Sequence, residues 1–144
     1  MEKNKMDKLI AMLKRHEGAE THVYMCSEDR YTIGVGRNVD PRGGLGLSED
    51  EIDYLLKNDI ERCYRELDRF SWFMDLDQVR QEALVNMCFN VGFTRLMKFS
   101  KMMAAMAEGN YPVAAAEALD SLWAKQVGNR SRDIAHMLEF GEYP

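Results

Sequence analysis

The sequence contains little cysteine. Its 144 residues include three cysteines, Cys26, Cys63 and Cys88, and none of them forms a Cys-x-x-Cys pair. An odd number of cysteines without such a pair argues against a disulfide framework and against a zinc ribbon. Free thiols suit a reducing compartment, where we expect the chain to fold.

Long apolar runs and an excess of positive charge are also missing. No apolar run approaches 18 residues, so we expect no insertion into a membrane. The first 15 residues lack the continuous apolar stretch of a signal peptide, so we expect none. The net charge of -5 argues against nonspecific binding to nucleic acid, which needs a clustered basic face.

The composition that is present is that of an ordinary globular protein. Apolar residues make up 46% of the chain and charged residues 30%. At this length a chain forms one domain, or one domain of two lobes, with a core that needs no metal or disulfide.

The first part of the chain changes from helical to strand-like patterning. Apolar residues at helical spacing predict a helix over Lys8–His16, and Gly18 is suited to end it. Between Thr21 and Gly36, β-branched and aromatic residues on both sides of a Ser27–Asp29 turn predict a small antiparallel sheet. Arg37–Leu47, with one proline and three glycines, is predicted to be a loop.

The remainder of the chain has helical patterning. Ser48-Glu49-Asp50-Glu51 predicts a capping box that opens a helix running to about Asp68. Further helices are predicted over Asp77–Val91, which has the composition of a buried helix, and near Arg95–Glu108, Pro112–Leu122 and Arg130–Leu138. A helix, a small sheet and then helices make an α+β fold.

Three separated motifs resemble a known family. Glu17-Gly18 is followed by a strand and by Tyr31-Thr32-Ile33-Gly34-Val35-Gly36; Ala83–Gly92 and Trp123–Arg132 follow downstream. The set is similar to the T-even-type phage lysozymes (endolysins) of glycoside hydrolase family 24. That family spaces its active residues as Glu, eight residues, Asp or Cys, five residues, Thr, and Glu17, Cys26 and Thr32 match this spacing.

The resemblance implies a lysozyme-like α+β fold over residues 1–144. A small N-terminal sheet lobe, about 17–47, would be joined by a long helix to a mainly helical C-terminal lobe, about 70–144 plus helix 1. The implied function is that of a monomeric muramidase without a cofactor. It would hydrolyse β-1,4 bonds between N-acetylmuramic acid and N-acetylglucosamine in peptidoglycan, and it would stay in the cytoplasm of the bacterial host until its release to the cell wall.

The resemblance also implies a role for each matched residue. A glycosidase needs a proton donor beside the glycosidic oxygen. Glu17 suits this role, because the dipole at a helix C-terminus disfavours a negative charge and so favours the protonated acid. The resemblance makes Arg130 the basic partner of Glu17. Thr32 would hold the attacking water, although strand propensity alone also explains a threonine there.

Cys26 stands where many family members carry Asp. A thiolate could orient water or stabilise positive charge if its pKa lies below the usual value of about 8.5, and it could also attack the sugar. A small buried thiol on a strand is the alternative. Glu28 or Asp29 could supply a carboxylate instead, but both fall in the predicted turn.

Further residues are candidates for binding the glycan, with structural roles as the alternatives: Gly36, Phe89, Asn90, Gln126 and Asn129. His22 and His136 show no ligand spacing, so we expect no metal. Two other functions stay open. One is a lytic transglycosylase acting on the same bond, and the other is a catalytically inactive module that binds cell walls.

Overall fold

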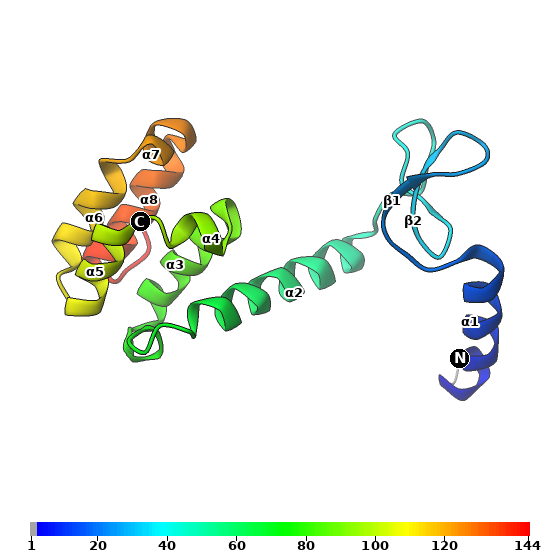
Figure 1. Cartoon of the computed structure of the whole chain (residues 1–144), viewed down its shortest axis with the longest axis horizontal. Coiled ribbons are helices and arrows are strands. Elements are labelled where there is room, and N and C mark those ends of the chain that lie inside the picture. The colour runs from blue at the N-terminus through cyan, green and yellow to red at the C-terminus, as the bar shows by residue number, and fades with distance from the viewer. Residues whose placement is uncertain (1–2) are drawn as a thin grey trace. The chain divides into compact units, whose positions relative to one another are not determined.

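The computed structural model describes residues 3–144, which form an α+β fold with one small sheet and many helices (Figure 1). The chain divides inside helix α2 into two units, Met1–Tyr54 and Leu55–Pro144. We call them the sheet unit and the helical unit. The lobe boundaries expected from the sequence, and the assignment of helix 1 to the helical lobe, stay predictions.

The sheet unit contains helix α1 (Lys3–Glu17) and three antiparallel strands, β1 (Glu20–Met25), β2 (Tyr31–Gly34) and β3 (Arg37–Asn38). The strands lie in the order β1-β2-β3, with Tyr24 opposite Thr32 and Thr32 opposite Asn38. The predicted helix, sheet and Ser27–Asp29 turn are confirmed. The loop predicted from Arg37 begins instead with β3, which is too short to give an alternating pattern.

Helix α2 (Glu49–Leu67) begins with the predicted capping box. The Ser48 amide donates to Glu51 Oε1 at 2.9 Å, and the Glu51 amide donates to Ser48 Oγ at 3.2 Å. Each side chain thus satisfies a backbone N–H that the first helical turn leaves without a partner. The capping box therefore fixes where α2 starts.

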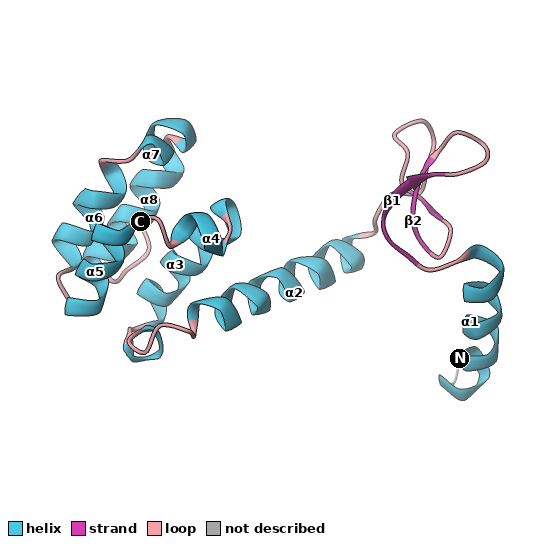
Figure 2. Ribbon diagram, viewed as in Figure 1, coloured by secondary structure: helices cyan, strands magenta, loops and turns pink. Residues whose placement is uncertain are grey.

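The helical unit contains the rest of α2 followed by seven further helical segments. These are the 3-10 turn η1 (Phe73–Asp75) and helices α3 (Gln78–Val91), α4 (Phe93–Leu96), α5 (Ser100–Glu108), α6 (Tyr111–Leu119), α7 (Leu122–Val127) and α8 (Asn129–Phe140). Helices are drawn in cyan in Figure 2.

The helices differ from the expectation at two places. The helix expected near Arg95–Glu108 is interrupted between α4 and α5, where Lys98 and Phe99 donate to carbonyls three residues back, a tighter pattern than the α-helix. The short helix α7 was not predicted, because six residues give too little periodicity. Its cap is regular: the Ala124 amide donates to Ser121 Oγ at 3.2 Å.

A continuous apolar core lies within the helical unit. Helix α3 is buried over Ala83–Val85 and at Met87 and Cys88, as expected for a central helix, and Trp123 is buried as well. Helix α8 packs against both α3 and α6. Other completely buried members of the core are Leu67, Phe73, Leu96, Ala114, Ala118 and Leu138. None of the helices within residues 3–144 is both long and apolar enough to cross a membrane.

Candidate active site

Glu17 is the last residue of α1, and its carboxylate lies against the β2–β3 turn. A Cβ atom placed on Gly36 would stand 3.1 Å from Glu17 Oε2 and 3.5 Å from Glu17 Cδ. Gly36 has a φ of 71°, which side chains rarely adopt. Glycine at this position thus lets the turn lie close to the carboxylate, where a Cβ atom would crowd it.

Cys26 and Thr32 lie on the neighbouring β1–β2 hairpin and share one hydrogen-bond partner. The Cys26 amide donates to the Arg30 carbonyl at 2.9 Å, and Thr32 Oγ1 donates to the same carbonyl at 2.9 Å. Thr32 is buried, whereas Cys26 is partly exposed. A half-exposed thiol beside a fixed hydroxyl is therefore reachable from solvent.

The turn favours the thiolate form of Cys26. Hydrogen bonds from the backbone at Glu28 and then Arg30 lower the thiol pKa, and a weaker contribution from the Thr32 hydroxyl acts in the same direction. Partial burial and the negative charge of Glu28 oppose them. Because the single hydroxyl proton of Thr32 already points to Arg30, we attribute the effect mainly to the backbone amides.

Sequence reasoning missed Asp40, which is the most heavily hydrogen-bonded carboxylate of the sheet unit. It is 2% exposed and accepts from the amides of Tyr31 (3.0 Å) and Arg42 (2.8 Å) and from the Arg42 guanidinium. These bonds, those from Arg42 first, hold the Asp40 pKa well below its usual range. A signal was present: Asn and Asp in a loop often accept from the amide two residues on, and both Asn38 and Asp40 do so here.

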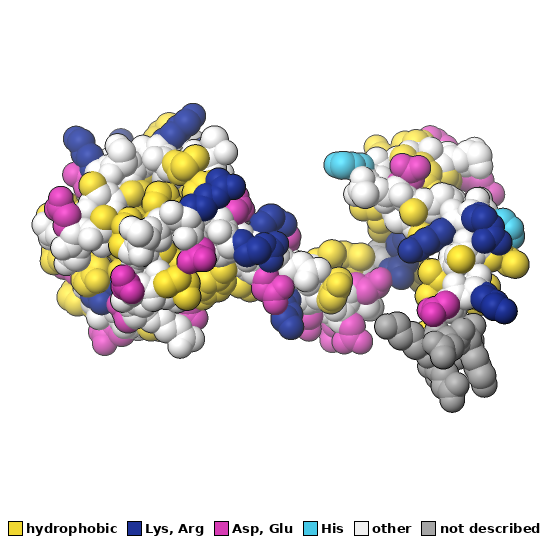
Figure 3. Space-filling view, turned by 60° about the horizontal axis from the view of Figure 1, so that its bottom comes forward, with side chains coloured by type: hydrophobic (Ala, Val, Ile, Leu, Met, Phe, Trp, Pro, Cys, Tyr) yellow, Lys and Arg dark blue, Asp and Glu magenta, His cyan; other side chains and the backbone are white. Residues whose placement is uncertain are grey.

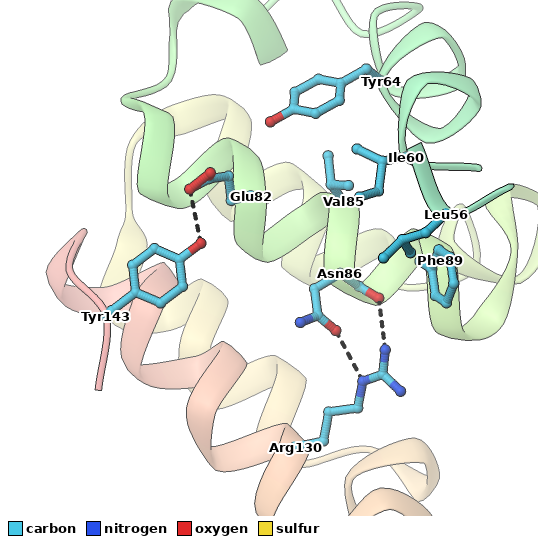
Figure 4. Close-up of a pocket in the computed structure, with 9 residues that line it drawn as sticks. All are labelled: Leu56, Ile60, Tyr64, Glu82, Val85, Asn86, Phe89, Arg130 and Tyr143. Atoms are coloured by element: carbon cyan, nitrogen blue, oxygen red, sulfur yellow. Dashed lines mark hydrogen bonds between the residues drawn. The ribbon is translucent and has the colours of Figure 1, made fainter. Parts of the chain in front are cut away.

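Two of the predicted residues in the helical unit, Phe89 and Arg130, line a pocket of about 300 Å³ (Figure 4). The Arg130 guanidinium donates to Asn86 Oδ1 at 2.9 Å, and across the pocket the Tyr143 hydroxyl donates to Glu82 Oε1 at 2.8 Å. The other lining residues are largely apolar: Leu56, Ile60, Tyr64 and Val85. The expected pairing of Arg130 with Glu17 joins residues of different units and stays a prediction.

The other predicted glycan-binding residues lie outside the lining of this pocket. Asn90 Oδ1 accepts from Trp123 Nε1 at 2.7 Å, which fixes the amide and leaves its NH₂ group to donate. Asn129 accepts from the Arg132 guanidinium, and Gln126 lies exposed on α7. Their roles toward a glycan stay predictions.

A metal site is not found within the described part of the chain: residues 3–144 bring together no group of three His, Cys, Asp or Glu side chains that could hold an ion. Cys26, Cys63 and Cys88 are free. Burial raises the pKa of Cys63 and raises that of Cys88 to about 12, so we expect these two thiols to react more slowly than Cys26.

Comparison with known proteins gives the family directly. The sequence profile described as phage lysozyme matches residues 14–136, which include the Glu17–Thr32 segment and both downstream motifs. The chain belongs to the phage lysozyme family. This confirms the resemblance inferred from the three motifs, and the small sheet followed by helices is the lysozyme-like α+β fold that was expected.

Individual relatives of this phage lysozyme family member come from very different sources. The chain is 27% identical to a probable T4-type lysozyme 2 of Dictyostelium discoideum, over 90% of the chain and 92% of that protein. It is 26% identical to an endolysin of Acyrthosiphon pisum secondary endosymbiont phage 1, over 87% of the chain and 84% of that protein. It is also 26% identical to the pre-baseplate central spike protein Gp5 of Enterobacteria phage T4, over 92% of the chain but 28% of that protein.

Proposed function

We propose that this chain is a muramidase that hydrolyses the β-1,4 bond between N-acetylmuramic acid and N-acetylglucosamine. Family membership supports a cell-wall hydrolase of the glycosidase class. The observation that carries the finer assignment is the Glu17 carboxylate against Gly36, on the same unit as the Cys26–Thr32 pair. A proton donor and a separate group for water are what hydrolysis of a glycosidic bond requires.

In the proposed reaction, Glu17 gives its proton to the glycosidic oxygen as the bond to the anomeric carbon breaks. A water molecule held at Cys26 and Thr32 attacks that carbon, and the Cys26 thiolate accepts the proton that the water loses. The products are two hydroxyl ends. Exchange with solvent then returns the proton to Glu17 and removes it from Cys26. The lowered pKa of Cys26 supports this role, because a thiolate can accept a proton.

A lytic transglycosylase is the second candidate. It needs one acid and base, and a hydroxyl of the sugar itself replaces water as the nucleophile. The observation that favours it is the thiol at position 26, where a hydrolase commonly carries a carboxylate. Mass spectrometry of the released fragments separates the two: hydrolysis leaves a reducing end, and transglycosylation leaves an anhydro sugar that is lighter by one water.

The first test is turbidity loss of purified peptidoglycan with the parent, Glu17→Gln and Glu20→Gln. We expect Glu17→Gln to lower the rate by about a hundredfold or more, since general acid catalysis contributes that much. Glu20→Gln is the matched control, because Glu20 is an exposed glutamate on β1, three residues from Glu17, and its rate should stay near that of the parent.

Failure has a distinct signature. A folded parent that binds peptidoglycan without releasing fragments between pH 5 and 8 would reject both enzymatic candidates and leave the wall-binding module. Equal rates for Glu17→Gln and Glu20→Gln would reject Glu17 as the acid while keeping the enzyme.

We further propose that the protein meets peptidoglycan strands as a monomer, after release from the cytoplasm of a bacterial host. Gel filtration of the purified chain tests the monomer, and a dimer would reject it. Fractionation of expressing cells tests the location, and early export of the chain would reject cytoplasmic storage.

A further inference from the structure

The buried carboxylate of Asp40 joins strand β2 to the loop that follows β3. Its Oδ2 accepts from the Tyr31 amide at 3.0 Å on β2, and its Oδ1 accepts from the Arg42 amide at 2.8 Å in the following loop. The Arg42 guanidinium also donates to both carboxylate oxygens, with Nε at 2.9 Å from Oδ1 and Nη2 at 2.9 Å from Oδ2. This bidentate pairing fixes the plane of the guanidinium as well as its distance from the carboxylate.

The same guanidinium reaches the turn that follows Cys26. Arg42 Nη2 donates to the Asp29 carbonyl at 2.6 Å, and Arg30 Nη1 donates to that carbonyl at 3.0 Å. The Asp29 amide in turn donates to the Cys26 carbonyl at 3.0 Å. Asp29 has a φ of 61°, which is uncommon for a residue with a side chain and needs support from its surroundings. The contact with Arg42 supplies such support.

Asp40 also holds the strand that carries Thr32. Tyr31 donates to Asp40 through its amide and accepts from the Val39 amide at 2.9 Å through its carbonyl, so both of its backbone groups are fixed. Thr32 is the next residue along β2. The buried carboxylate therefore acts on both members of the Cys26–Thr32 pair, on Thr32 through β2 and on Cys26 through Arg42.

We propose that Asp40 and Arg42 are positioning residues that hold Cys26 and Thr32 in the arrangement used for catalysis. The proposal rests on the proposed function only in assigning a catalytic use to the pair; the positioning itself is a statement about the hairpin. Asp40 and Arg42 need not touch the glycan. They fix the backbone amides around Cys26, and losing them disorders the turn rather than the fold of the whole chain.

Thiol reactivity separates positioning from simple charge. Glu28 is the charge that acts on Cys26 most directly; Asp29 and Arg30 lie on the same hairpin, and the Asp40–Arg42 pair faces that hairpin from the loop. Removing the negative charge of Asp40 would by Coulomb's law alone favour the thiolate and lower the pH at which Cys26 reacts. Loss of the aligned amides would raise that pH. The pH at which Cys26 reacts should therefore fall in Asp40→Asn if only the charge of Asp40 matters, and rise if Asp40 positions the amides.

The experiment measures alkylation of Cys26 by iodoacetamide against pH in the full chain, with peptide mass spectrometry to separate Cys26 from the buried Cys63 and Cys88. We expect Asp40→Asn to raise the midpoint by about half a pH unit or more, since hydrogen bonds to a charged group shift it on that scale. Arg42→Lys keeps the positive charge but loses the bidentate pairing with Asp40, so we expect the alkylation midpoint of Cys26 to rise in this variant too. Arg37→Ala, which breaks a different ion pair of the sheet unit, should leave the midpoint unchanged.

The steady-state readout is the turnover of soluble glycan fragments. If Cys26 and Thr32 act on water, Asp40→Asn and Arg42→Lys should lower kcat by about tenfold while KM changes little, because misplaced catalytic groups slow the chemical step. Circular dichroism confirms that each variant is folded, and if Asp40→Asn does not fold, Arg42→Lys decides.

A midpoint that falls or stays constant in a folded Asp40→Asn variant, or that stays constant in Arg42→Lys, would overturn the proposal. An inert parent would reject the proposed function instead. In that case the alkylation midpoints still decide whether Asp40 and Arg42 position the hairpin.

Discussion

Different forces stabilise the sheet unit and the helical unit. In the helical unit 24 apolar residues are buried and form one cluster, whereas in the sheet unit the fully buried side chains among the described residues are the polar Thr32 and Asp40. Apolar side chains of the sheet unit, such as Val23, Met25 and Leu45, are exposed. The space-filling view shows apolar side chains in yellow on the surface of the molecule (Figure 3). The helical unit thus relies on burial of apolar surface, and the sheet unit on hydrogen bonds and ion pairs.

This difference suits the role proposed for the sheet unit. A three-stranded sheet with strands of two to six residues offers little apolar area and is marginal by itself. Directional bonds to buried charge compensate, because they specify one geometry rather than general compaction. The geometry of the sheet unit, which carries Glu17, Cys26 and Thr32, therefore depends on polar contacts.

The largest expected effect comes from opening a cavity in the helical core. Leu84 on α3 is completely buried, so Leu84→Ala should lower the free energy of unfolding by about 2–5 kcal/mol. Urea denaturation followed by tryptophan fluorescence reports on this unit, since both tryptophans lie in it. Leu45→Ala, in the sheet unit, is followed by hydrogen exchange of that unit; it removes a leucine that is 84% exposed and should lower the free energy of unfolding by less than about 0.5 kcal/mol. An equal loss in the free energy of unfolding for the two variants would mean that burial of apolar side chains does not stabilise the helical unit more than the sheet unit.

The next effect tests the polar packing of the sheet unit. A Cβ atom on Gly44 would stand 2.5 Å from Asn38 Oδ1 and 2.7 Å from both the backbone nitrogen and the carbonyl oxygen of Asp40. Gly44→Ala should therefore push the loop off Asp40, at a cost of about 1–3 kcal/mol. Hydrogen exchange should show lost protection at the Tyr31 amide. Gly43→Ala has open space around it and strains only its own φ of 94°, so the Tyr31 amide should keep its protection. Protection that survives in both variants would contradict the loop packing.

A smaller effect concerns the start of α2, where the sheet unit ends. Ser48→Ala removes the acceptor for the Glu51 amide and should destabilise the helix start by about 1 kcal/mol. The change should be local, with faster hydrogen exchange over the first turn of α2 and unchanged protection in α3. Ser48→Thr keeps the hydroxyl and serves as the control. Loss of protection in α3 would show that the two regions unfold together.

The amino-acid sequence predicted the fold class and the elements with strong local signals. The capping box at Ser48–Glu51, the sheet around Tyr31–Gly34 and the buried helix α3 were predictable, because each signal acts over a few neighbouring residues. The break between α4 and α5 and the short α7 were not, since tertiary contacts decide short segments. Glu17, Cys26 and Thr32 were found by spacing. Asp40 and Arg42 were missed because their contacts with the hairpin join residues that lie 9 to 13 positions apart, Asp40 with Tyr31 and Arg42 with Asp29.

The smallest expected effect is the acid sensitivity of the sheet unit. A hydrogen bond from Arg37 at 2.7 Å and the Ser48 amide lower the pKa of Glu51 to about 2. The Asp40 pKa is lowered further by Arg42. Because these pKa values lie below those of the unfolded chain, the stabilisation is complete above about pH 4.5 and is lost as the pH falls through the folded values.

As the pH falls from 5 to 2, the sheet unit should therefore lose hydrogen-exchange protection before the helical unit, whose apolar core does not titrate. In the helical unit burial raises the pKa of Asp77, but bonds from Arg80 outweigh this and lower it, so a modest acid effect is expected there too. Glu51→Gln should weaken the sheet unit at neutral pH and flatten its pH dependence. High salt should reduce the Glu51 contribution, because Arg37 and Glu51 are 36% and 38% exposed. Earlier opening of the helical unit would contradict this comparison, since it would mean that titrating charges stabilise the helical unit more than they stabilise the sheet unit.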